Sequence, residues 1–164
     1  MNTPKESLVC PEGVADVMIV MVCFENPLKE HGISFMSDVL TQKRRVIIPT
    51  SSVIGAYHIA IRYLGVPKLA VKKVLDGLLS TRSPAFYPQI TPDLTSNALE
   101  YATYYDVESW DGCLISLAKS LGTSTIFSLD KQLSKVKGIS VVNPFSEEAM
   151  EEYHEFLMKS MKSK

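Results

Sequence analysis

Strand-like and helix-like apolar patterns alternate along this 164-residue chain, and this alternation constrains the fold more than any other feature. Short apolar runs rich in β-branched or aromatic residues predict strands at 46–49, 86–90, 125–128 and 139–142. Parallel strands need crossover connections, usually helices, so strands alternating with helices are typical of a parallel sheet. We therefore predict an α/β fold of three layers, α/β/α, with a central parallel sheet of about five strands.

Capping residues and helix breakers indicate where the helices lie between these strands. Ser or Thr accepts hydrogen bonds from free N–H groups at a helix start, Pro fits the first helical turn, and Gly ends helices. The last helix, at 146–158, is amphipathic, with acidic residues on its outer side. Predicted helix starts are Ser51 or Ser52, Pro67, the Thr-Pro-Asp signal at 91–93, Ser109 and Ser146.

The segment 17–24 carries two conflicting signals. Its β-branched residues favour a strand, whereas Asp16 just before it favours a capped helix. We predict a short strand ending at Asp16 and a buried helix after it. A strand over 17–24 would place Asp16 at the wrong end of the strand for the site considered next.

Asp16, Asp111 and Asp130 lie where predicted strands pass into helices. In an open parallel sheet the carboxyl ends of the strands line the ligand-binding crevice, so three aspartates there can converge. Converging carboxylates bind Mg²⁺ or Mn²⁺, and such a site can activate water against a phosphodiester. The competing interpretation is that each aspartate only caps a helix.

Composition bounds the kind of protein. We expect one domain over 1–164, in which 146–164 form a C-terminal helix and tail. The net charge of −1 argues against a large basic surface for nucleic acid, so any RNA has to be held by a local patch. The three separated cysteines fit reduced thiols and a cytoplasmic location, and the longest apolar run is too short for a membrane span.

Two motifs, in order and at a familiar spacing, resemble a known family. Residues 105–118 contain an aspartate, Asp111, that opens a small apolar helix, and 125–133 contain a strand closing on Ser128, one residue, and Asp130. With these motifs, residues 46–144, extending back to 14, resemble a PIN domain. This is the fold of metal-dependent nucleases that includes ribonuclease toxins of toxin–antitoxin pairs and RNA-processing enzymes.

The resemblance implies a function and partners. It implies a ribonuclease that uses Mg²⁺ or Mn²⁺ held by Asp16, Asp111 and Asp130, with RNA as substrate. It also implies a homodimer and, for a toxin, an antitoxin protein as partner. The sequence of residues 48–65 is similar to that of archaeal PIN proteins, which implies an archaeal source.

The chain departs from the family pattern at two places. Val17 stands where active members usually have Thr or Ser, and Gly55 and Ala56 stand where a glutamate is usual. Fewer anionic ligands mean weaker cation binding, so either another carboxylate substitutes or the site is poorly active. Glu108 and Glu100 are the candidate substitutes, and Ser128 is a candidate support for Asp130. The alternative function is a catalytically impaired RNA-binding or protein-binding module.

Three further features carry open interpretations. The basic run Lys43, Arg44 and Arg45 can bind phosphates or complement a helix end. His58 is predicted to be a core or interface histidine, with a proton shuttle as the alternative. Trp110 is predicted to pack against the sheet or a second subunit, with stacking on a nucleobase as the alternative.

Overall fold

The computed structural model describes residues 10–88 and 90–162, and its centre is a five-stranded sheet in which every pair of neighbouring strands is parallel. The strand order is β3-β2-β1-β4-β5. The predicted α/β class with a central parallel sheet of five strands is therefore confirmed. The strands are β1 (Gly13–Ala15), β2 (Val46–Pro49), β3 (Phe86–Tyr87), β4 (Thr125–Phe127) and β5 (Ser140–Val142).

Helices connect the strands much as the capping signals predict. Thr91 caps its helix, because its Oγ1 accepts a hydrogen bond from the Leu94 N–H at 3.1 Å, and Pro67 directly precedes another helix. The link between the last two strands contains a 3₁₀ helix, η1 (Lys131–Lys135). The α-helices are α1 (Val17–Met21), α2 (Lys29–Leu40), α3 (Thr50–Arg62), α4 (Lys68–Ser80), α5 (Pro92–Tyr105), α6 (Ser109–Ser120) and α7 (Glu147–Lys162).

One capping prediction is wrong. Helix α3 starts at Thr50, directly after Pro49, and has no side-chain cap. Ser52 lies inside the helix, and its buried hydroxyl donates to the Ala15 carbonyl at 3.3 Å. Neither Ser51 nor Ser52 caps the helix; the Ser52 side chain instead ties α3 to the end of β1.

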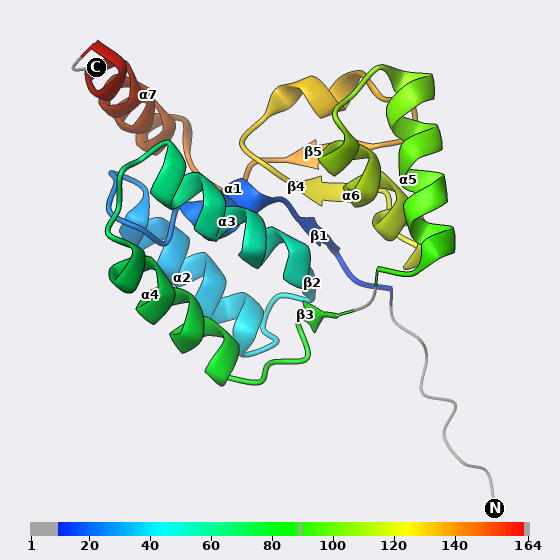
Figure 1. Cartoon of the computed structure of the whole chain (residues 1–164). Helices are drawn as coiled ribbons and strands as arrows, with labels where there is room; N and C mark the ends of the chain where they lie inside the picture. The colour runs from blue at the N-terminus through cyan, green and yellow to red at the C-terminus, as the bar shows by residue number, and fades with distance from the viewer. Residues whose placement is uncertain (1–9, 89, 163–164) are drawn as a thin grey trace, which may run out of the picture.

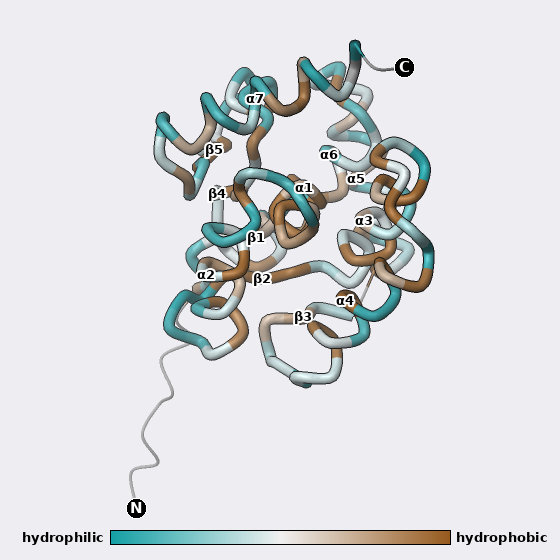
Figure 2. Tube along the Cα trace, turned by 90° about the vertical axis from the view of Figure 1, so that its left-hand side faces the viewer, coloured by the Kyte–Doolittle hydropathy of each residue, from teal (hydrophilic) through white to brown (hydrophobic). Residues whose placement is uncertain are grey.

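The conflict over residues 17–24 is resolved as predicted. Strand β1 ends at Ala15, and Asp16 caps α1 by accepting a hydrogen bond from the Val17 N–H at 2.5 Å. The helix is buried over Ile19, Val20 and Met21. A hydrophobic α1 of this kind fits only inside the molecule, and Figure 2 shows it at the centre beside β1 and β2.

Strand β3 includes Phe86 and Tyr87 and ends before Pro88, so it is shorter than the predicted 86–90, of which residue 89 lies outside the described residues. It lies at the edge of the sheet, next to β2. Pro88 follows it, and proline, which lacks an N–H donor, is tolerated in sheets mainly at such an edge. The edge position of β3 is therefore compatible with the proline that follows it.

Helices cover both faces of the sheet (Figure 1). On one face, Ala15, Ile48 and Phe127 pack with apolar residues of α1, α2, α3 and α4. On the other face, Val14 and Ile126 pack with α5, α6 and η1. Successive residues of a strand point to opposite faces, which is why Val14 and Ala15 belong to different cores.

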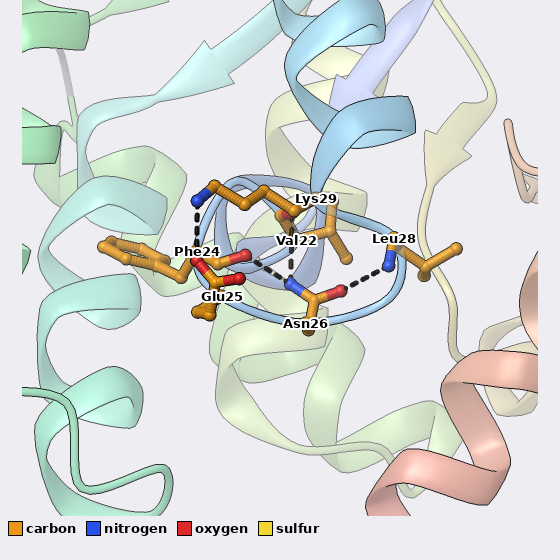
Figure 3. A network of polar contacts seen from close by, with 6 residues as sticks. All are labelled: Val22, Phe24, Glu25, Asn26, Leu28 and Lys29. Atoms are coloured by element: carbon orange, nitrogen blue, oxygen red, sulfur yellow. Dashed lines mark hydrogen bonds and ion pairs between the residues drawn. The ribbon is translucent and has the colours of Figure 1, made fainter.

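The link between α1 and α2 is held by its own polar contacts (Figure 3). The Asn26 amide donates to the Phe24 carbonyl at 2.7 Å, and its oxygen accepts from the Leu28 N–H at 2.7 Å. Lys29 forms an ion pair with Glu25. Leu28 is buried against Tyr153 and Ala149 of α7, so the C-terminal helix packs over this link.

Candidate functional site

The first part of the site lies at the ends of two neighbouring strands. Strands β1 and β4 are paired, so Asp16 and Ser128, which follow them, lie together at the carboxyl edge of the sheet. Ser128 is fully buried, and its hydroxyl donates to Asp16 Oδ2 at 2.8 Å. The same hydroxyl accepts from the Asp130 N–H at 3.0 Å. Ser128 thus links two of the candidate aspartates.

Asp111 reaches the same edge by a route that differs from the prediction. It lies in the first turn of α6 and follows helix α5, not a strand. Asp106 ends α5 in a left-handed conformation, with φ of 53°, which turns the chain towards α6. Gly112 permits the close packing of α6 on α5, because a Cβ atom there would lie 2.2 Å from the Ala98 carbonyl oxygen.

The carboxylates are close enough to influence one another. Burial raises the pKa of Asp111 to about 6, with further upward contributions from the charges of Asp16, Asp130 and Glu108, while Lys135 lowers it. Burial also raises the pKa of Asp16, assisted by the charge of Asp130 and opposed by the hydrogen bonds from Ser128 and Val17. The edge is a partly buried cluster of negative charge.

Two cavities meet at this cluster. The larger cavity, about 480 Å³, is lined by Asp16 and Asp111 together with residues of α3 and α6. The smaller cavity, about 260 Å³, is lined by Asp111, Asp130 and Lys135. Asp111 and Glu108 line both cavities and therefore stand between them.

The supporting candidates separate into two groups. Glu108 and Ser128 lie at the carboxyl edge with the aspartates, whereas Glu100 is exposed on α5 and lines neither cavity. The segment Lys43 to Arg45 precedes β2, at the opposite edge of the sheet. Arg44 there pairs with Glu12, with Nε 2.8 Å from Oε2, and its guanidinium lies 5.4 Å from the centroid of the Phe35 ring.

The position of the usual glutamate falls on α3 beside the larger cavity. Gly55 lines the cavity, and a Cβ atom there would lie 3.1 Å from Val17 Cγ2. Ala56 is fully buried in the apolar core and faces away from the cavity. The departure thus leaves the cavity wall without a side chain at Gly55, where a Cβ atom would be in tight contact with Val17.

Carboxylate oxygens at Asp16, Asp111 and Asp130 are the donor type that Mg²⁺ and Mn²⁺ prefer. The mutual repulsion that helps to raise the pKa of Asp111 is a cost that a bound cation would offset. In residues 10–88 and 90–162, however, no three His, Cys, Asp or Glu side chains form a group arranged to hold a metal ion. The donor chemistry therefore fits a divalent ion, while the side chains do not form a ready three-ligand set.

Two residues of the larger cavity lie away from the core, and sequence reasoning missed a third residue beside the site. Trp110 is 62% exposed and lines the larger cavity, so it does not pack against the sheet, and its contact with a second subunit stays a prediction. His58 is exposed on α3 and lines the same cavity, so it is not a core histidine, and its place at an interface stays a prediction. Lys135, in η1, had no sequence signal beyond its place five residues after Asp130.

Comparisons with known proteins bear on the fold. No protein-family model matches the sequence, and no curated protein matches it either. A toxin–antitoxin complex from Klebsiella pneumoniae contains a chain that is 14% identical with a TM-score of 0.54, over 82% of this chain and 98% of that chain. FitAcB from Neisseria gonorrhoeae is 17% identical with a TM-score of 0.55, over 80% of this chain and 96% of that one.

At these identities the likeness concerns the fold alone. It is consistent with the PIN-like fold that the sequence motifs implied, with the same class of parallel sheet flanked by helices. Within the described residues, no helix is both long and apolar enough to cross a membrane.

Proposed function

We propose that this chain is a divalent-metal-dependent endoribonuclease that hydrolyses RNA phosphodiester bonds. Its catalytic, metal-binding residues are Asp16, Asp111 and Asp130. The observation that carries the proposal is the clustering of these carboxylates, from three separate parts of the chain, at one edge of the sheet. Their proximity is expressed in the pKa of Asp111, which burial and the neighbouring charges raise to about 6. Isolated helix caps would not repel one another in this way.

The residues of the site have different roles in this mechanism. Ser128 fixes the orientation of Asp16 through its hydrogen bond to Oδ2, which leaves the carboxylate held against the end of β1. Lys135 lies beside Asp111 and is placed to stabilise negative charge on a phosphate. Asp16, Asp111 and Asp130 would hold Mg²⁺ or Mn²⁺, which would supply a bound water of lowered pKa and offset charge in the transition state.

A toxin-like or RNA-processing role in the cytoplasm is the biological setting we propose. The support is the similarity in fold to a chain of a toxin–antitoxin complex and the resemblance of the two aspartate motifs to ribonuclease toxins. An antitoxin protein is the expected partner if the chain is a toxin.

A second function has its own supporting observation. No carboxylate stands at Gly55 or Ala56, so the site lacks an acid that active members of the PIN family usually have. A non-catalytic RNA-binding or protein-binding module with this fold is the function that this loss favours.

Cleavage of single-stranded RNA separates the two functions. We expect the enzyme to cleave slowly, to require Mn²⁺ or Mg²⁺, and to lose at least about 100-fold of its rate on Asp111→Asn, since Asn keeps the shape and the capping ability but not the charge. Asp93→Asn, in the first turn of α5, is the matched control and retains activity. Cleavage that survives both excess chelator and Asp111→Asn contradicts the mechanism, and intact RNA binding without cleavage in any metal favours the module.

A further inference from the structure

The larger cavity has a composition that a metal site alone does not explain. Most of its wall is apolar, with Val17 from α1, Ile54 and Ile59 from α3, and Leu114 from α6. Its volume of about 480 Å³ is within the range of cavities that hold a small organic group. Apolar walls of this kind exclude water and favour a flat, weakly polar ligand.

Trp110 gives the cavity an aromatic face. It directly precedes Asp111, and its side chain is 62% exposed although it lines the cavity. On the α3 side of the cavity, Ile54 is 71% exposed. An indole offers a large aromatic face on which a planar π-system can stack, and exposed apolar side chains beside it indicate that this surface is available to a ligand.

Gly55 keeps the space open. The proteins that the motifs resemble usually have a glutamate at this point of the helix, whereas this chain has no side chain at all. A Cβ atom at this position would lie 3.1 Å from Val17 Cγ2, which is a tight contact, so a larger side chain would press on Val17 in the wall of the cavity. Glycine thus leaves the wall beside Asp16 and Asp111 without a side chain at this position.

We propose that the larger cavity binds one unpaired nucleobase of the RNA, stacked on Trp110, next to the phosphate held at Asp16 and Asp111. This inference rests on the proposed function. It specifies single-stranded RNA or an unpaired loop as the substrate class, because a base inside a duplex is stacked and paired and cannot enter the cavity. His58 and Ser51, which also line the cavity, are the polar groups available to the edge of the base.

Tryptophan fluorescence tests this directly, because Trp110 is the single tryptophan of the chain. The protein is titrated with a single-stranded oligoadenylate in Ca²⁺, with gels confirming that the RNA stays intact, and binding is followed separately by anisotropy of labelled RNA. We expect quenching of the indole by oligoadenylate. We expect none from an abasic ribose-phosphate oligomer of the same length, which has the phosphates but no bases.

Two variants and two matched controls complete the test. Trp110→Ala should weaken oligoadenylate binding about 5- to 150-fold, the range for loss of one base–aromatic stack. Tyr104→Ala, at an aromatic 80% exposed on α5 and outside both cavities, should change binding less than about twofold. Gly55→Leu should weaken binding by filling the cavity, whereas Gly77→Leu, in the interior of α4 with open space around it, should not.

The outcomes distinguish the inference from the proposed function. Normal RNA binding by Trp110→Ala and Gly55→Leu overturns the base-binding cavity and leaves the ribonuclease proposal intact. Failure of every single-stranded RNA to bind and to be cleaved overturns both. A third outcome is that the indole fluorescence changes with protein concentration alone and that the Trp110→Ala variant is a monomer. This outcome assigns Trp110 to a subunit contact and also overturns the base-binding cavity.

Discussion

At the scale of single residues, Ser128 is the member of the candidate site that connects two of the aspartates by hydrogen bonds. It is fully buried and bonded to both Asp16 and Asp130. Sequence reasoning identified it as a support for Asp130, and its hydroxyl does accept from the Asp130 N–H, but the donation to Asp16 was missed. The difference arises because only the pairing of β1 with β4 brings Asp16 next to it, and pairing is not encoded in a local motif.

Ser128→Ala should therefore have two effects. It leaves Asp16 Oδ2 without its partner, so we expect a loss of about 1–3 kcal/mol in the free energy of unfolding. We also expect Mn²⁺ affinity to fall about tenfold or more, as when other groups that orient ligands are removed. Urea unfolding and Mn²⁺ titration by calorimetry measure the two effects.

Ser116→Ala is the matched control for this substitution. Ser116 is also buried, and its hydroxyl donates to the Leu94 carbonyl at 3.0 Å, away from the site. It should lower stability by a similar amount and leave Mn²⁺ affinity unchanged. Equal Mn²⁺ affinities for the two variants would show that Ser128 does not orient a ligand.

The raised pKa of Asp111 predicts how stability depends on pH in the absence of divalent ions. The folded state keeps the proton up to a pKa of about 6, above the ordinary value of 3.8, so folding binds a proton between these values. Stability should therefore be full below about pH 4 and decline as pH rises through about 6. Asp111→Asn removes this loss, so the free energy of unfolding of the variant should exceed that of the wild type at pH 7.5. We expect a difference of only about 1 kcal/mol, because solvent screens a half-buried carboxylate.

Thermal unfolding in chelator at pH 4 and pH 7.5 checks this prediction. The advantage of Asp111→Asn over the wild type should appear at pH 7.5 and vanish at pH 4. Asp93→Asn, at the start of α5, is the control for replacing an aspartate in the first turn of a helix. A wild type more stable than Asp111→Asn at pH 7.5 would show that the carboxylate acts as a stabilising cap instead.

At the scale of elements, helix α3 determines the consequence of the missing acid. The family resemblance points to Gly55 and Ala56 without separating them, because a register of one residue on a helix is not fixed by a weak motif. The structure separates them, since Gly55 lines the larger cavity and Ala56 is buried in the core.

Gly55→Glu should consequently restore a ligand. We expect Mn²⁺ affinity to rise about tenfold, as an added carboxylate strengthens binding of a hard cation. Ala56→Glu instead buries a charge among apolar side chains and should destabilise the fold by several kcal/mol. Calorimetric titration measures the Mn²⁺ affinity of the two variants, and urea unfolding measures their stability. A folded Gly55→Glu variant with unchanged Mn²⁺ affinity would show that this position does not face the metal.

Helix α6 shows why Trp110 is exposed although it shares a helical stripe with a core residue. Trp110 is four residues before Leu114, so the helical pattern assigns both to one stripe. Leu114 packs into the core between α5, α6 and the sheet, but the first turn lies at the carboxyl edge, where the larger cavity faces it. A sequence pattern reports which face of a helix is apolar and not how far the neighbouring layer extends.

At the scale of the whole molecule, the class of fold was predictable and the order of strands was not. The alternation of elements implied a parallel sheet, as found. The order β3-β2-β1-β4-β5 depends on which side each crossover takes, and it is this order that places β1 beside β4. The meeting of Asp16 with Ser128 follows from the order, whereas the approach of Asp111 depends on the packing of α6 against α5.

Apolar residues exposed on α3 and α4, and between these helices, support assembly into the homodimer that the family resemblance implies. Tyr57, Leu64 and Leu69 are 39%, 42% and 78% exposed. Burying such residues against a second copy is favourable, and twofold dimers are the commonest soluble oligomers. Light scattering should give about twice the 18.2 kDa chain mass at tens of micromolar, a range set by common affinities, and Leu69→Glu should lower it.

Leu99→Glu, on α5, is the control for this experiment, since Leu99 is 56% exposed on a different helix. It should leave the mass unchanged. A wild-type mass of one chain throughout the concentration range would contradict the dimer.

The central claim is that Asp16, Asp111 and Asp130 together bind a divalent ion. A crystal of the protein soaked in Mn²⁺ tests it most directly, because anomalous scattering locates the ion independently of any assay of activity. We predict an anomalous peak within about 2.5 Å of a carboxylate oxygen from each of the three aspartates. A fully soaked crystal with no peak at these residues, or with a peak that excludes Asp111, would contradict the account.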